Sequence, residues 1–326
     1  MTAGRKRASL CAAVLAVLIF VPLVLDLGSR VMNLMVTLFI YIILAEGWNV
    51  IGGYTGQVNL GIVAFFGVST MVTHFLWKAG LPVFVAISSG TLSAVVLAVL
   101  IGLPTLRLRG MYFAVGTLAL AQAAQTIVAN VFTRQVSMPG SFSANYSLSP
   151  RYYLGLILAC ASVVVVHVVA RSKVGLAMAA LRDDEEAARV TGVRVFRYKV
   201  TALMISAALA GLAGGLYGYV RLSFWQVASV FSPSWTFDAV LSVVVGGAGT
   251  LFGPVVGSVF LVVLSELFAN TLGQAHLIVF GFVFILVVLF LPQGLMGGAD
   301  LLHRRKMPSR PEAGMEAQAP PIRGRP

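Results

Sequence analysis

Residues 31–51 read VMNLMVTLFIYIILAEGWNVI, and this stretch decides the fold class of the chain. It contains a single charged residue, Glu46. An α-helix rises about 1.5 Å per residue, so a run of this length covers the ~30 Å hydrocarbon core of a bilayer. The stretch therefore predicts a membrane-spanning helix.

Other charge-poor apolar runs repeat this pattern on both sides, at residues 8–25, 82–103, 110–132, 152–170, 200–220, 251–269 and 275–292. Two shorter runs, 62–77 and 236–248, lie beside glycine-rich sequence. Short, glycine-interrupted segments are tolerated at membrane depth only where protein or a water-filled cavity surrounds them. We therefore predict an all-α polytopic membrane protein of about ten transmembrane helices, in which the two short segments face the interior.

The composition agrees with this class. Of the 326 residues, 59% are hydrophobic and 10% are charged, whereas roughly a quarter of residues are charged in ordinary soluble domains. A soluble domain, a disordered chain and a disulfide scaffold are thereby excluded. A membrane domain is expected over residues 1–298, followed by a disordered cytoplasmic tail over 299–326 that is rich in Pro, Arg and Glu.

The formal net charge of +12 is unevenly distributed. With ten crossings, 18 of the 23 Lys and Arg residues fall on one side of the membrane and the other five on the opposite side. The positive-inside rule assigns the richer side, and with it both termini, to the cytoplasm. The basic excess is then explained by the lipid bilayer, and no nucleic-acid partner is required.

One charged insertion, residues 171–199, interrupts the apolar pattern; we call it the charged segment. Four consecutive acidic residues, Asp183 to Glu186, lie within it. Good helix formers over 175–191, with Gly192 after them, predict a single short helix. Four successive carboxylates leave this helix no apolar face for lipid, so it meets either a polar protein partner or water, with internal pairs such as Glu185 with Arg189.

Residues 186–192, Glu-Ala-Ala-Arg-Val-Thr-Gly, resemble the Glu-Ala-Ala-x-x-x-Gly coupling signature of ABC importer permeases, a cytoplasmic helix that docks in a groove of the ATP-binding subunit. In that role alanines permit close approach, the glutamate supplies a charged contact, and the glycine turns the chain back towards the membrane. The residues that this resemblance implies for coupling are Asp183, Asp184, Glu185, Glu186, Ala187, Ala188 and Gly192.

Further motifs extend the resemblance: GYTGQVNLG at 53–61, LPTLRLRGMY at 103–112, LRDDE at 181–185, RYK at 197–199, SAALAGLAG at 206–214 and PQGL at 292–295. As an ordered set over about residues 40–297, they resemble the permease subunit of branched-chain amino-acid ABC importers, the LivM type. The resemblance implies a type II ABC importer permease fold in the inner membrane. It also implies three kinds of partner: a second homologous permease subunit, two ATP-binding cassette subunits and an external solute-binding protein.

The sequence contains no Gly-x-x-x-x-Gly-Lys-Ser/Thr motif, His-Glu-x-x-His motif, Gly-x-Ser-x-Gly motif or Cys/His cluster. We therefore expect no enzyme activity, no metal site and no cofactor in this chain, with ATP and Mg²⁺ bound by the partner subunits.

Polar residues near the second and eighth spans are candidates for the translocation pathway: Glu46, Asn49, Gln57, Asn59 and Asp238. An ionised carboxylate is costly in lipid, so Glu46 should face the interior of the bundle. These side chains either line the pathway or its gate, or form structural hydrogen bonds that fix the glycine-rich turn.

The expected activity is therefore ATP-driven import of branched-chain amino acids, with urea, short amides and small organic acids as alternative substrates. The alternative mechanism is an ion-coupled secondary transporter. It would need an ion site within the chain, for which Glu46, Asp238 and Glu266 are the acidic candidates.

Overall fold

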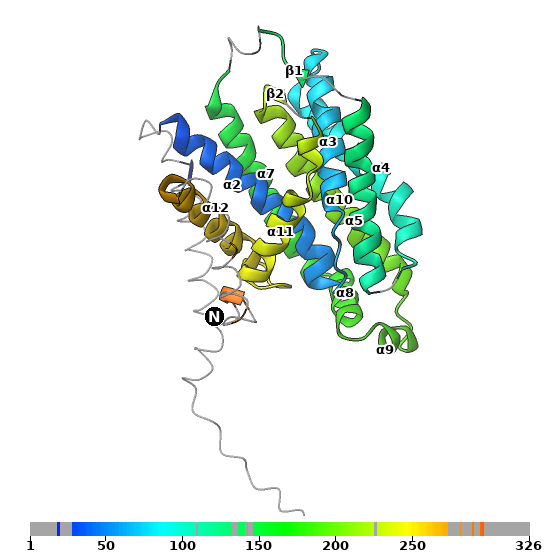
Figure 1. Cartoon of the computed structure of the whole chain (residues 1–326). Coiled ribbons are helices and arrows are strands. Elements are labelled where there is room, and N and C mark those ends of the chain that lie inside the picture. The colour runs from blue at the N-terminus through cyan, green and yellow to red at the C-terminus, as the bar shows by residue number, and fades with distance from the viewer. Residues whose placement is uncertain are drawn as a thin grey trace, which may run out of the picture.

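A computed structural model describes residues 18–19, 28–108, 110–131, 136–140, 142, 146–224, 227–272, 281, 289 and 294–296. Apart from isolated positions, the predicted spans 8–25 and 275–292 and the predicted tail 299–326 lie outside these residues. The elements (Figure 1) are, in chain order, α2 (Ser29–Trp48), the π-helix η1 (Asn49–Tyr54), α3 (Ile62–Lys78), α4 (Val83–Thr105), α5 (Met111–Val131), β1 (Val136–Ser137), α7 (Leu148–Arg171), α8 (Lys173–Asp183), α9 (Glu185–Val190), α10 (Val195–Val220), β2 (Ser223–Phe224), the 3₁₀ helix η2 (Val227–Phe231), α11 (Pro233–Gly246) and α12 (Gly253–Leu272).

The apolar runs form helices, as predicted. In the described part of the chain, six helical stretches are long and apolar enough to cross a membrane, and two shorter apolar stretches are Ile62–Lys78 (α3) and Gly253–Phe268 (in α12). The two strands are two residues long and pair antiparallel. The polytopic helical class is confirmed, whereas the count of ten crossings stays a prediction.

Helix α10 lies at the centre of the bundle, and its small residues let neighbouring backbones approach closely. A Cβ added to Gly214 would overlap the carbonyl group of Phe66 in α3. At the same contact, Ser69 Oγ donates to the Gly211 carbonyl at 2.6 Å, and Thr70 Oγ1 donates to the Gly214 carbonyl at 2.9 Å. Between helices in lipid, such packing and hydrogen bonds replace the hydrophobic effect as the source of stability.

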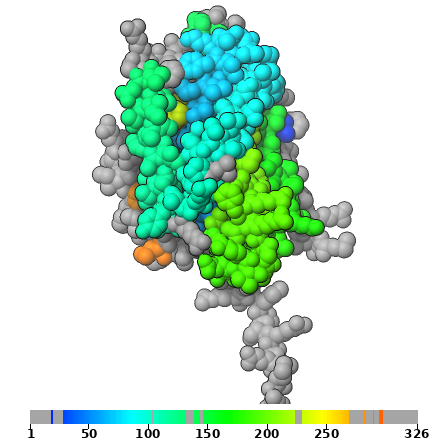
Figure 2. Space-filling view, turned by 90° about the vertical axis from the view of Figure 1, so that its right-hand side faces the viewer, coloured from blue at the N-terminus to red at the C-terminus, as the bar shows by residue number. Residues whose placement is uncertain are grey.

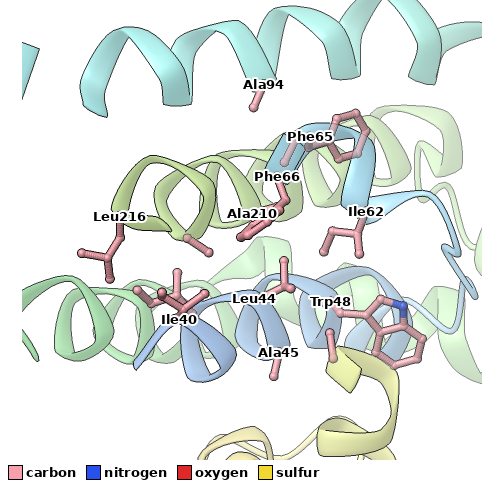
Figure 3. Close-up of a cluster of buried hydrophobic side chains, with 14 of the residues drawn as sticks. Ile40, Leu44, Ala45, Trp48, Ile62, Phe65, Phe66, Ala94, Ala210 and Leu216 are labelled. Atoms are coloured by element: carbon pink, nitrogen blue, oxygen red, sulfur yellow. The ribbon is translucent and has the colours of Figure 1, made fainter. Parts of the chain in front are cut away.

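Large apolar side chains fill the space around this contact. Figure 3 shows Phe65 and Phe66 of α3 beside α10, with Ile40 and Leu44 of α2 on the other side. Trp48 ends α2 inside this core, and its indole Nε1 donates to the Asn59 carbonyl at 2.7 Å. The core therefore fixes the start of the glycine-rich turn as well as the helices.

A buried arginine joins α7 to α10 at the end of the bundle that carries β1 and β2 (Figure 1). The Arg151 guanidinium carbon lies 4.0 Å from the ring centroid of Tyr146 and 4.6 Å from that of Tyr219. Its Nε donates to the Tyr219 carbonyl at 3.4 Å. The aromatic rings and the carbonyl satisfy a charge that would otherwise be costly to bury.

The contact between α3 and α10 predicts the effect of adding one methyl group. We expect Gly214→Ala to destabilise the protein by about 1–3 kcal/mol because the neighbouring group is backbone and cannot rotate away. The control is Gly116→Ala in α5, where the added Cβ would meet only the end of the Leu108 side chain. Thermal unfolding in detergent should show a lower midpoint for Gly214→Ala alone; equal midpoints would contradict the packing argument.

Candidate functional site

The charged segment forms two helices rather than the single predicted helix. Helix α8 ends at Asp183, and Asp184 takes an extended conformation with φ −157° and ψ 115°. The Asp184 carboxylate accepts hydrogen bonds from the backbone N–H groups of Glu186 at 2.8 Å and Ala187 at 3.0 Å. The one-helix prediction was wrong because Asp184 leaves the helix to cap the next one, which is a preferred position for aspartate.

Helix α9 ends as the sequence predicts. Its last residue is Val190, and Gly192 follows with a φ of +89°. A left-handed backbone favours glycine, since a Cβ is disfavoured at positive φ. The turn directs the chain into α10, which begins at Val195.

Two of the residues predicted for coupling, Glu185 and Ala188, hold α9 against α10. Ala188 is buried in a cluster with Leu181 and Val195. Glu185 accepts a hydrogen bond from Lys199 Nζ of α10 at 2.6 Å and lies 3.6 Å from Arg189. The Lys199 side chain is only 5% exposed, so the first pair is shielded from water on one side.

The other predicted coupling residues, Asp183, Asp184, Glu186, Ala187 and Gly192, are exposed. Val190 lies among them with an exposed fraction of 89%, although it is apolar. Figure 1 shows α8 and α9 at the end of the bundle opposite β1 and β2, and in Figure 2 the green residues of this region form the lower end of the described surface. The charged segment thus presents a small, mixed polar and apolar surface beyond the ends of the long helices.

Three of the predicted pathway residues are buried near the glycine-rich turn. Asn49 Nδ2 donates to the Thr250 carbonyl, and Asn49 Oδ1 accepts from the Gly249 N–H, both at 2.9 Å. Asn59 Oδ1 accepts from the Gly61 N–H at 2.8 Å. Glu46 is completely buried and so faces the interior, as predicted. These bonds fix η1 and the turn that follows it, and a direct role in the pathway stays a prediction.

The remaining two candidates are Gln57, in the glycine-rich stretch itself, and Asp238 in α11. Gln57 is half-buried in the loop between η1 and α3. Asp238 lines a cavity of about 680 Å³ between α2, α11 and α12, where the Tyr41 hydroxyl donates to its Oδ2 at 3.1 Å. Arg30 and Glu266 form an ion pair at 2.7 Å in the same cavity.

Eight of the eleven residues that line this cavity have polar side chains, Arg30, Asn33, Thr37, Tyr41, Ser234, Asp238, Ser265 and Glu266, and the other three are Leu34, Leu261 and Val262. Its volume is that of a small-molecule site. The pathway candidates chosen from the sequence include only Asp238 from this set. The spacing of polar residues in α2, at positions 30, 33, 37 and 41, places them on one helix face and is the signal that was missed.

These features together define the class: a polytopic membrane transport protein with a polar cavity between helices and a folded polar segment at one end. Residues 30–288 match the family described as the permease component of the branched-chain amino acid transport system, and the chain belongs to this family. It is a permease subunit of the ABC importer type.

Individual relatives agree with the family assignment. The chain is 30% identical over 324 residues to the high-affinity branched-chain amino acid transport system permease protein LivM of Salmonella typhimurium, covering 87% of this chain and 73% of the relative. It is 30% identical to LivM of Escherichia coli, with coverages of 79% and 68%. It is 25% identical to the LivH permease protein of Salmonella typhimurium, with coverages of 80% and 92%. No solved structure matches the chain.

The Glu185–Lys199 pair predicts how firmly α9 is held. Lys199→Ala should increase the rate of amide hydrogen exchange in residues 185–193 about fivefold, because losing about 1 kcal/mol of local stability raises the population of the opened state by that factor. Arg189→Ala is the control: its pair with Glu185 is more exposed and contributes little. Equal exchange in the two variants would show that the buried pair does not hold α9.

Proposed function

We propose that this chain is one of two transmembrane subunits of an ATP-driven importer in the inner membrane, and that it carries branched-chain amino acids or a related small polar solute. The membership of the family carries the proposal, because the names of its relatives describe permease proteins of branched-chain amino acid transport. An external solute-binding protein delivers the solute, and both termini lie in the cytoplasm.

The second transmembrane subunit is a homologous permease. The similarity of the chain to both LivM and LivH relatives supports this pairing, since the two names designate two permease proteins of one kind of transport system. In such an assembly the cavity between α2, α11 and α12 provides a polar route through the bilayer. Its one arginine and two carboxylates suit a solute that carries both charges.

The importer contains two ATP-binding cassette subunits, and one of them docks on the charged segment of this chain. Val190 is 89% exposed among the charged residues of this segment, and docking of an ATPase subunit would cover it. The segment is already folded, capped by Asp184 and fixed to α10 by Lys199, so docking requires little ordering of the chain.

The energy source is tested in right-side-out vesicles that contain the complete importer and internal ATP. We expect leucine uptake to require ATP and to continue when a proton or sodium ionophore is added at constant ATP. A parallel panel of urea, a short amide and a small organic acid identifies the solute class. Uptake that stops with an ionophore at constant ATP would instead support the ion-coupled secondary transporter, with Glu46, Asp238 or Glu266 as the ion site.

The docking surface is tested by Val190→Lys. Lysine is favourable near a helix C-terminus and the position is exposed, so the permease should fold normally. A charge at the centre of a protein contact should weaken binding of the ATPase subunits at least tenfold and reduce uptake in proportion. Val190→Ile keeps the apolar surface and serves as the control. Normal co-purification of the ATPase subunits with Val190→Lys would place the docking surface elsewhere.

A further inference from the structure

Arg182, in the last turn of α8, connects the charged segment to two elements of the membrane bundle. Its Nη1 donates to the Gly53 carbonyl of η1 at 2.8 Å, across 129 positions of sequence. The same side chain reaches the turn between α11 and α12, since a Cβ added to Gly249 would overlap Arg182 Nη1. One guanidinium group therefore lies where three segments meet.

Two glycines make room for this arginine. Gly56 has a φ of +73°, and its missing Cβ would lie 3.3 Å from both the Cα and the Cγ of Arg182. Gly249 has a φ of +76°, and its missing Cβ would also lie 3.0 Å from the Gly53 carbonyl oxygen. A side chain at position 249 would push the guanidinium group away from that carbonyl.

The two elements that Arg182 contacts are themselves joined. Asn49 of η1 bonds through its amide to both Gly249 and Thr250 of the α11–α12 turn. Further along the same helices, the Tyr41 hydroxyl of α2 donates to Asp238 of α11 in the polar cavity. Arg182 is thus bonded to η1, which continues α2 and is joined to the α11–α12 turn. The parts of α2 and α11 farther from Arg182 line the cavity.

We propose that Arg182 is the positioning residue that transmits movement of the charged segment to α2, η1 and α11, and thereby to the polar cavity. This inference rests on the proposed function, in which ATPase subunits move the charged segment. Arginine suits the role because its planar guanidinium makes directional, charge-assisted hydrogen bonds to carbonyl groups. The ion pair between Glu185 of α9 and Lys199 of α10 holds α9, the helix that follows Arg182, against the bundle.

The first test measures solute uptake and ATP hydrolysis together in the reconstituted importer. With Arg182→Ala, we expect the ATPase subunits to stay bound and hydrolysis to remain within twofold of wild type, while leucine uptake per ATP hydrolysed falls at least tenfold. Arg182→Lys, which keeps the charge and one donor direction, should recover part of that ratio. A purely structural role would instead lower the yield or both rates together and leave the ratio unchanged.

A second variant alters the same contact on the side of the α11–α12 turn. Gly249→Ala should displace the guanidinium group and reduce uptake per ATP hydrolysed as Arg182→Ala does, although the charged segment is unaltered. Gly110→Ala is the matched control: its φ is also positive, at +55°, and no atom lies within 4 Å of the added Cβ. It should keep the wild-type ratio.

The outcomes separate the two proposals. A wild-type ratio in both Arg182→Ala and Gly249→Ala overturns the inference and leaves the proposed function intact. Loss of the ATPase subunits from Arg182→Ala, or unfolding of Gly249→Ala while Gly110→Ala folds, also overturns it, because Arg182 is then a docking or structural residue. Absence of ATP-dependent uptake in the wild type overturns the proposed function and the inference with it.

Discussion

The direct backbone contact between α3 and α10 is the constraint on which the rest of the structure depends. Gly214 and Gly218 lie against the backbone of α3, and hydroxyl groups of Ser69 and Thr70 bond to α10 carbonyls across the contact. Because no space is left for larger side chains, this contact sets the position of α10. Helix α10 in turn carries Lys199 at one end and Tyr219 at the other. The α3–α10 contact therefore determines the position of both residues, and with them the contacts at both ends of the bundle.

One group of polar contacts lies where the backbone is irregular. The helix break at Asp184, the π-helix after Trp48 and the positive-φ glycines of the α11–α12 turn all lie near one another, where Arg182 and Asn49 bond to backbone atoms. Irregular backbone leaves carbonyl and N–H groups that need partners, and charged or amide side chains supply them. The junction around Arg182 therefore lies where regular helix stops, whereas the cavity is lined by side chains within α2, α11 and α12.

Much of this architecture could be predicted from the sequence, because a membrane-spanning helix depends on length and polarity alone. The spans over 31–51 and 152–170 are examples. What could not be predicted depends on competition or on distant contacts. Residues 175–191 have good helix propensity, yet the cap at Asp184 interrupts them. Ala187 and Ala188 are identical in sequence terms, and only the packing of Leu181 and Val195 buries one of them. The polar face of α2 at positions 30 to 41 can be read from the sequence, but the cavity forms only because α11 and α12 pack beside that face.

The π-helix over Asn49–Tyr54 has a consequence for how this protein can change over evolutionary time. Each residue of an α-helix turns the chain by about 100°, so the wider turn of η1 sets the direction in which the glycine-rich loop leaves α2. Removing one residue there would restore an α-helix and rotate everything that follows relative to the Asn49 side chain. Val50 and Ile51 are buried and Gly53 lies against the backbone of Gly249, so the segment should reject a change in its length as well as larger side chains at these positions.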